Sequence, residues 1–522
     1  MNQTASDSLD STSLADIAET YELELQAVHC HLGAATSDLL QLLSLICARN
    51  ASRQQTQGLL ESACARLQTL RSDIAELVSI ADATDIESEI DQASSALQTG
   101  DGFSLDDADA ACERAYRISL EAPGRSEIAV RIRAAQALIA ATGLNFRHAA
   151  ALFAEAASTA DIEPGLQWHY LHHQALALED LGREFIDSEA LQAAIELYEQ
   201  TILPLTPAQE QPAERAKILD SLGNVLGILG QRQRGTRTLE RAISAFQDAL
   251  TLCQREQMPS AWASTQNNLG NALGILGQRQ HEETLLEQSI AAFECALEVR
   301  TSEETPEAWA TTQNNLGAVL QSLGQQRKDG KMLKRAVDAY KALLTVWTRA
   351  RLPLAWSTAM DNLGTALRLL GEQRKGPRTL EQSVAAYKAA LSVRSRERLP
   401  HYWALTQNNL GATLQVLGER TDDPVALGKS VAAFRETLKQ WTREHEPMSW
   451  AMTMANLGVA RRKLAERSAD VEISRRATKD IKSAVDVFRG ASHAQLTELG
   501  EEQLAIARKL TTALEASTTE SQ

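Results

Sequence analysis

A segment of 47 residues recurs along this chain without insertions, and this recurrence limits the possible folds more than any other feature. Its template opens with Pro-x-x-Trp, continues with Asn-Leu-Gly and closes with a second Leu-Gly, starting at Pro259, Pro306, Pro353 and Pro400. The same register carries tryptophans from Trp262 to Trp450 and glycines from Gly223 to Gly458. A fixed period of this length predicts an array of stacked supersecondary units, each too small to form a core alone.

Within one unit, the apolar residues are spaced as on two helices. The first set is separated by 7, 4 and 3 residues, and the second by 4, 3 and 4: Trp262, Leu269, Leu273, Leu276, then Leu286, Ile290, Phe293, Leu297. These separations match a helical period of 3.6 and predict a hairpin of a helix A and a helix B. Gly270 falls inside helix A, where glycine is unfavourable, so we expect helix B to approach closely there.

The order of small and large residues in this hairpin resembles the tetratricopeptide repeat. In one unit it reads Leu269-Gly270, Leu273, Gly277, Ser289, Phe293 and Ala296. The resemblance covers residues 206–490, but the ordinary repeat has about 34 residues. We expect about seven of the extra residues to lie in the hairpin turn, between Gly277 and Ser289. The pattern is similar to extended bacterial repeats found beside caspase-like protease domains and to the repeats of kinesin light chains.

The resemblance implies an all-α fold, a right-handed α-solenoid of antiparallel helical hairpins preceded by an N-terminal helical domain. Five segments are predicted: a disordered tail (1–13), an acidic helical N-terminal domain (14–120), two degenerate repeats (121–205), six extended repeats (206–490), and a C-terminal capping helix with a tail (491–522). Atypical terminal units are expected, because a solenoid must cover its end faces.

A row of asparagines precedes the Leu-Gly pairs and is the best candidate for repeated residues that packing does not require. Its members are Asn268, Asn315, Asn362, Asn409 and Asn456, with Asn267, Asn314, Asp361 and Asn408 one position earlier. By resemblance, helix A lines the concave groove, and an amide that both donates and accepts can bind the backbone of an extended peptide. The alternative is that these side chains only tie neighbouring A helices together.

A second row, of arginines, also keeps the register or a multiple of it: Arg255, Arg349, Arg396 and Arg443. These residues could form a positive edge for an acidic partner, or they could be solvated surface charges. The tryptophans recur on the apolar face of helix A, so we expect them in the core rather than as a stacking platform for bases.

Two clusters could offer imidazole groups to a metal, His29-Cys30-His31 and the trio His169, His172 and His173. Neither comes with a second ligand cluster, and no set of nucleophile, base and oxyanion donors occurs, so we predict no metal, no cofactor and no enzyme activity. The net charge of −16 disfavours nucleic acid, and no stretch is apolar enough to span a membrane or serve as a signal peptide.

The sequence therefore predicts a cytoplasmic scaffold or adaptor whose groove binds a peptide or partner protein, with self-association as a further possibility. The alternative is a regulatory or sensor protein whose repeat array controls the N-terminal helical domain. Deleting residues 1–120 would distinguish the two, because an adaptor would keep its partner.

Overall fold

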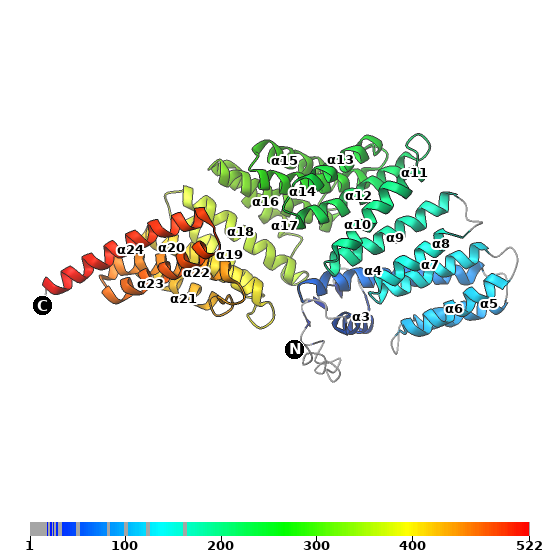
Figure 1. Cartoon of the computed structure of the whole chain (residues 1–522), viewed down its shortest axis with the longest axis horizontal. Helices are drawn as coiled ribbons and strands as arrows, with labels where there is room; N and C mark the ends of the chain where they lie inside the picture. The colour runs from blue at the N-terminus through cyan, green and yellow to red at the C-terminus, as the bar shows by residue number, and fades with distance from the viewer. Residues whose placement is uncertain are drawn as a thin grey trace. The chain divides into compact units, whose positions relative to one another are not determined.

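The structure is a computed structural model that describes residues 34–48, 53–80, 84–98, 103–121, 126–159 and 164–520, with isolated residues between 18 and 29 (Figure 1). The predicted tail 1–13 and the residues Cys30 and His31 lie outside this part. Within it every regular element is a helix, which confirms the all-α prediction. None of these helices is both long and apolar enough to cross a membrane.

The described residues form two compact units, 1–312 and 313–522. The first contains α3 (Thr36–Ala48), α4 (Arg53–Ile80), α5 (Thr84–Ala96), α6 (Leu105–Glu121), α7 (Ser126–Thr142), α8 (Phe146–Ala157), α9 (Pro164–Glu184), α10 (Ser188–Leu197), a π-helix η1 (Tyr198–Ile202), α11 (Leu203–Leu205), α12 (Pro212–Arg232), α13 (Arg237–Leu252), α14 (Pro259–Gln280) and α15 (Glu283–Leu297). Helix α16 (Pro306–Gln326) includes the division between the units.

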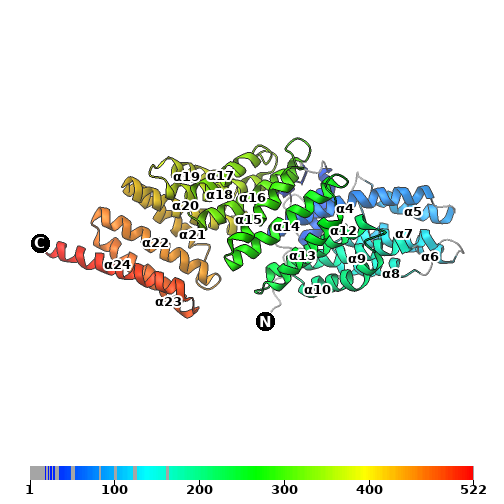
Figure 2. The same ribbon diagram turned by 90° about the horizontal axis from the view of Figure 1, so that it is seen from above.

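The second unit continues with α17 (Gly330–Leu343), α18 (Pro353–Gln373), α19 (Arg378–Leu391), α20 (Pro400–Thr421), α21 (Pro424–Thr437), α22 (Pro447–Ser468), α23 (Val471–Gly490) and α24 (Ala494–Glu520). In both units the helices are packed as consecutive hairpins, for example α12 with α13 and α20 with α21 (Figure 2). The predicted A and B helices are therefore present, as is the helix after the last repeat.

Proline opens the A helices because its missing N–H has no intrahelical partner in the first turn. Gly270 of α14 faces Phe293 of α15 so closely that a Cβ would lie 2.8 Å from the ring. The Ser289 hydroxyl of α15 donates to the carbonyl oxygen of Gly270 at 2.6 Å. The close approach expected at this glycine is confirmed, and a hydrogen bond between the two helices accompanies it.

The hairpin turn is shorter than predicted. Helix α14 continues past Gly277 to Gln280, and α15 already begins at Glu283. His281 takes a left-handed conformation, φ 54°, and the chain changes direction at this residue. The extra residues therefore mostly lengthen the helices. Gly277 remains helical because its missing Cβ makes room for Leu286, whose nearest atom would be 3.0 Å away.

One hydrophobic core joins the N-terminal helices to the first hairpins, with buried residues from Leu25 to Ala177. Helix α4 packs against α7, and the guanidinium of Arg66 on α4 pairs with Asp180 on α9 at 3.0 Å. Residues on both sides of the predicted boundary at 120 thus share this core, and the five-segment division stays a prediction.

Candidate binding groove

The asparagine row lies along the A helices, at corresponding heights on α14, α16, α18, α20 and α22. Asn267 and Asp361 are buried, with 7% and 6% of their surface exposed, and the other members are half-buried. Consecutive A helices contact each other, as α12 with α14 and α20 with α22. The predicted ladder is therefore carried by helices that neighbour one another within each unit.

The ladder side chains bind from one repeat to the next. Asn362 Nδ2 donates to Asn314 Oδ1 at 3.0 Å, and Asn268 Nδ2 reaches Asp220 Oδ1 at a long 3.4 Å. Both bonds join the asparagine of one repeat to the preceding position of the repeat before it. Part of the hydrogen-bonding capacity of the ladder is thus spent on tying A helices together, as the structural alternative predicted.

Two further ladder residues, Asn408 and Asp361, form hydrogen bonds with side chains of the next A helix. Asn408 Oδ1 accepts from Thr453 Oγ1 at 3.3 Å. Burial raises the pKa of Asp361, and the nearby Arg394 and the hydrogen bonds from Thr406 and Asn409 oppose this rise. No hydrogen bond of the Asn456 side chain is found within the described ranges, so the ladder is least occupied at its C-terminal end.

A buried arginine beneath the ladder was missed by the sequence reasoning. Arg394, only 3% exposed, donates from Nη1 to Thr406 Oγ1 at 2.8 Å and from Nη2 to Thr358 Oγ1 at 2.9 Å. Its Nη1 also lies 3.4 Å from Asp361 Oδ1. Arg300, two repeat lengths earlier, makes the same kind of contact with Thr312. Arg300 and Arg394 are separated by twice the repeat length, and this spacing could have identified them from the sequence.

A hollow opens on the A-helix face of the first unit. A cavity of about 270 Å³ is lined by residues of α9, α12, α13 and α14, and its polar residues include Asn224, Asn268 and Asn271. Asn224 Nδ2 is bonded to Asp220 Oδ2 at 3.3 Å, whereas the Asn271 side chain has no hydrogen bond to any described residue. Ile228 and Ile275 supply apolar walls. The cavity therefore combines one amide without a hydrogen bond in the described part of the chain, that of Asn271, with apolar surface.

An ionic network forms one wall of this cavity, which we call the groove cavity. Glu179 Oε1 accepts from Arg183 Nη1 at 3.2 Å, and Arg183 also pairs with Asp180 and Glu184. Burial raises the pKa of Glu179 to about 7, because the effect of Arg183 does not offset desolvation. The carboxyl group is thus poised to change its charge near neutral pH.

Each guanidinium of the arginine row lies over a tryptophan ring. The guanidinium groups lie 5.4 to 5.9 Å from the ring centres of the tryptophans seven residues later, pairing Arg255, Arg349, Arg396 and Arg443 with Trp262, Trp356, Trp403 and Trp450. Three of the four reach a residue of the next repeat: Glu298, the Ser392 carbonyl and the Lys439 carbonyl. The tryptophans are half-buried rather than fully in the core, and an arginine lies over one face of these four rings.

The histidine trio of α9 is packed into the protein. His172 Nδ1 lies 3.2 Å from the Tyr198 hydroxyl, and burial lowers the pKa of His172 to about 3 and that of His173 to about 4. Within the described ranges, no three His, Cys, Asp or Glu side chains are gathered as a metal site.

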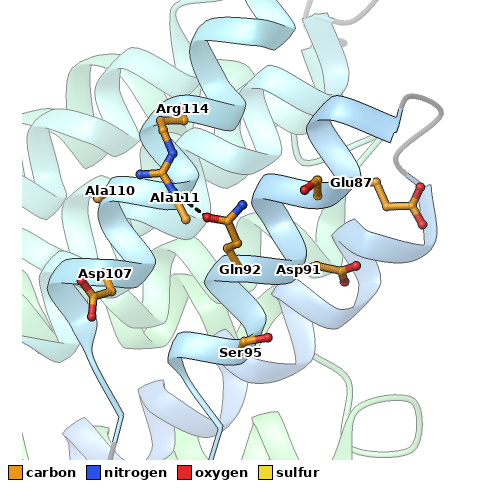
Figure 3. A pocket seen from close by; sticks show the side chains of 9 residues that line it. Glu87, Asp91, Gln92, Ser95, Asp107, Ala110, Ala111 and Arg114 are labelled. Atoms are coloured by element: carbon orange, nitrogen blue, oxygen red, sulfur yellow. Dashed lines mark hydrogen bonds between the residues drawn. The ribbon is translucent and has the colours of Figure 1, made fainter.

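A further pocket, of about 740 Å³, opens between α5 and α6 (Figure 3). It is lined by the carboxylates of Glu87, Asp91 and Asp107, with Arg114 donating to Gln92 at 3.0 Å. The pocket has no aromatic wall and is not connected to the ladder.

Comparison with known proteins identifies the hairpins. A tetratricopeptide repeat family model matches residues 262–297 and 309–344, the first of which coincides with α14 and α15. No curated protein matches the chain.

Several solved structures are similar to it. BtubC from P. vanneervenii is 23% identical over 46% of this chain and 92% of its own, with a TM-score of 0.35. The apo form of RapI is 13% identical over 73% and 97%, with a TM-score of 0.42. The human IFIT1 dimer with PPP-AAAA is 13% identical over 95% and 96%, with a TM-score of 0.38. Two hairpins of this chain thus match the tetratricopeptide repeat family, and the 47-residue register repeats their pattern from Gly223 to Gly458.

Proposed function

We propose that the protein is a non-enzymatic interaction scaffold that binds an extended peptide, or an extended segment of a partner protein, along its A helices. The observation that carries this proposal is the groove cavity, where the unpaired amide of Asn271 lies beside ladder residues and apolar walls. An amide can donate to a peptide carbonyl and accept from a peptide N–H. A row of amides can therefore bind the backbone of an extended peptide whatever its side chains are.

The hydrogen bonds between ladder residues limit which of their amide groups can bind a peptide. Because Asn362 already donates to Asn314, it offers the partner its own oxygen and its second N–H. Asn268 in the groove cavity is held by long contacts to Asp220 and Asn267, and it can exchange them for shorter bonds. We therefore place the strongest peptide contacts at Asn268, Asn271 and Asn456, and we retain Asn315 and Asn409 as weaker contacts.

A peptide-binding experiment tests this proposal. Peptides selected from a random phage-displayed library on the intact chain would be titrated by fluorescence anisotropy against the wild type and Asn271→Ala. Two lost hydrogen bonds of about 1 kcal/mol each predict a roughly thirtyfold weaker Kd. Gln247→Ala, at an exposed position of α13, is the matched control and should leave the Kd unchanged.

Equal affinity of the wild type and Asn271→Ala for every selected peptide would place binding elsewhere. Asn268→Ala serves as the second variant, and circular dichroism with urea unfolding would show whether losing its contact to Asp220 alters the fold.

A regulatory role for the N-terminal helices is the second candidate. Arg66 of α4 pairs with Asp180, which pairs in turn with Arg183 at the wall of the groove cavity. Movement of α4 would therefore release a charge beside the groove. Arg66→Ala should change the affinity for a selected peptide severalfold, whereas the exposed control Arg117→Ala should not. An unchanged affinity in Arg66→Ala would argue against this coupling.

A further inference from the structure

A separate cavity of about 400 Å³ lies between α4 and the helices α7, α8 and α9. Its size is that of a small-molecule site. Leu77, Ala135 and Leu138 supply an apolar wall, while Phe153 and Tyr170 supply aromatic rings. The α4 and α7 helices pack directly on each other, and they lie side by side in Figure 1. All of these residues belong to the first unit and lie outside the groove cavity.

The aromatic side of this cavity continues into two histidines. The rings of Phe153 and His173 are stacked with centres 5.3 Å apart, and His169 meets His173 edge to face at 4.6 Å. Burial lowers the pKa of His169, and it lowers that of His173 to about 4, so both rings are neutral at pH 7. Lys217 of α12 adds to both shifts. A neutral imidazole, unlike an imidazolium, does not repel a cation in the cavity.

The carboxylate side of the cavity has one unmatched charge. Arg131 pairs with Glu76 at 3.0 Å and with Glu127 at 3.2 Å, so its charge is already shared between two acids. Asp73 lies in the same wall, half-buried, and makes no hydrogen bond or ion pair with any described residue. A carboxylate and neutral aromatic rings that line the same small cavity are together complementary to a cation.

The pocket between α5 and α6 shows that acidity alone does not make such a site. It is more strongly acidic, with Glu87, Asp91 and Asp107, yet it has no ring to cover a cation (Figure 3). An exposed carboxylate cluster of this kind attracts ions only through solvent-screened charge. This pocket therefore supplies a matched comparison for the cavity at Asp73.

We propose that the cavity at Asp73 binds a small molecule that carries a protonated amine or guanidinium on an apolar body. The cationic group donates to the Asp73 carboxylate, and the body packs against Phe153 and Leu138. The ring of Tyr170 and the neutral imidazole of His173 flank the cation. Binding of this kind is independent of the peptide groove, so the two proposals can fail separately.

The test uses two probes of the same shape, 2-phenylethylamine and the uncharged 2-phenylethanol. Each would be titrated into the intact chain at pH 7 and followed by saturation-transfer NMR. We expect the amine to bind the wild type, and to bind Asp73→Asn about tenfold or more weakly, because the variant loses a charge-assisted hydrogen bond. Asp91→Asn is the control, and it should bind the amine as the wild type does.

Three results would overturn the proposal. They are no saturation transfer from the wild type to the amine, equal binding of the amine by Asp73→Asn, and equal binding of the alcohol and the amine by the wild type. Asp73→Asn preserves side-chain shape, and circular dichroism would confirm its fold. Filling the cavity with Ala134→Phe gives an independent variant, which should abolish binding of the amine without changing the charge.

Discussion

At the residue scale, glycines of helix A set how closely each hairpin packs. A Cβ on Gly364 would lie 2.8 Å from the Tyr387 ring, and one on Gly371 would lie 2.7 Å from Leu380. Gly227 of α12 differs, because a Cβ there would meet nothing within 4 Å. The recurring glycines are thus required by contact with helix B, whereas Gly227 carries only the conformational cost of glycine in a helix.

Gly270→Ala should destabilise the protein by about 1–3 kcal/mol, because the new methyl overlaps the Phe293 ring. Gly227→Ala should instead stabilise it by about 0.5–1 kcal/mol, since alanine is the better helix former and space is free. Urea unfolding followed by circular dichroism measures both. Equal effects of the two substitutions would contradict the packing argument.

Glu179 predicts a pH dependence of stability. Its pKa is about 7 in the folded protein against an ordinary 4.5, so the folded state binds more protons between these values. This carboxyl group therefore makes the free energy of unfolding fall as pH rises from about 4.5 to 7. Glu179→Gln should remove that contribution, which is seen as a smaller loss of stability over this window than in the wild type. Parallel pH profiles of the two proteins would contradict the assignment.

At the scale of the element, an arginine near the end of one A helix holds the end of the preceding one. Arg279 Nη1 donates to the carbonyl oxygens of Gly230 and Gln233 at 2.8 and 2.9 Å, and Nη2 donates to that of Gln231 at 2.6 Å. A cation there also offsets the negative end of the helix dipole. Arg420 makes the same contacts with α18, but Gln373 occupies the corresponding place one repeat earlier.

Arg279→Gln, which installs the residue found at Gln373, should lower stability by about 1–2 kcal/mol through lost hydrogen bonds to a charged donor. The reverse change, Gln373→Arg, should raise stability by joining α18 to the C-terminal carbonyls of α16. Urea midpoints of the two variants provide the measurement. A stable Arg279→Gln would mean that solvent replaces these contacts without cost.

At the scale of the whole molecule, a repeat array needs a covered end. Helix α24 packs against α23, and Leu504 and Ala507 are buried against Ile481 and Val485. Leu504 is 7% exposed, whereas Leu499 on the same helix is 52% exposed. The helix therefore presents one buried face to the last hairpin and a different face to solvent, as a capping unit should.

Leu504→Asp should detach this cap, because a carboxylate cannot be buried among apolar residues without a partner. We expect a loss of about 2–4 kcal/mol and an increase in self-association through the exposed end. Unfolding curves and light scattering measure the two effects. Leu499→Asp is the matched control, and a similar loss in that variant would show that charge on α24, rather than the cap, is responsible.

The sequence by itself determined the hairpins, because their causes are local and repeated. The spacing of Leu269, Leu273 and Leu276 defines one helix face, and a glycine packed on Phe or Tyr, as Gly270 is on Phe293, recurs in the first five extended repeats. The length of the turn was predicted wrongly, because the residue type at a left-handed position such as His281 does not identify that conformation. Helix propensity then carries α14 past Gly277, although glycine normally favours an end there.

Only the tertiary structure decided what the polar residues contact. Sequence periodicity placed Asn268 on helix A but left open whether its side chain contacts Asp220 of the preceding repeat. The meeting of Asp73 with His173 depends on how α4 packs across the first hairpins, which no repeat encodes. Hydrogen bonds and charges act over a few ångströms, so their partners are fixed only once distant helices are brought together.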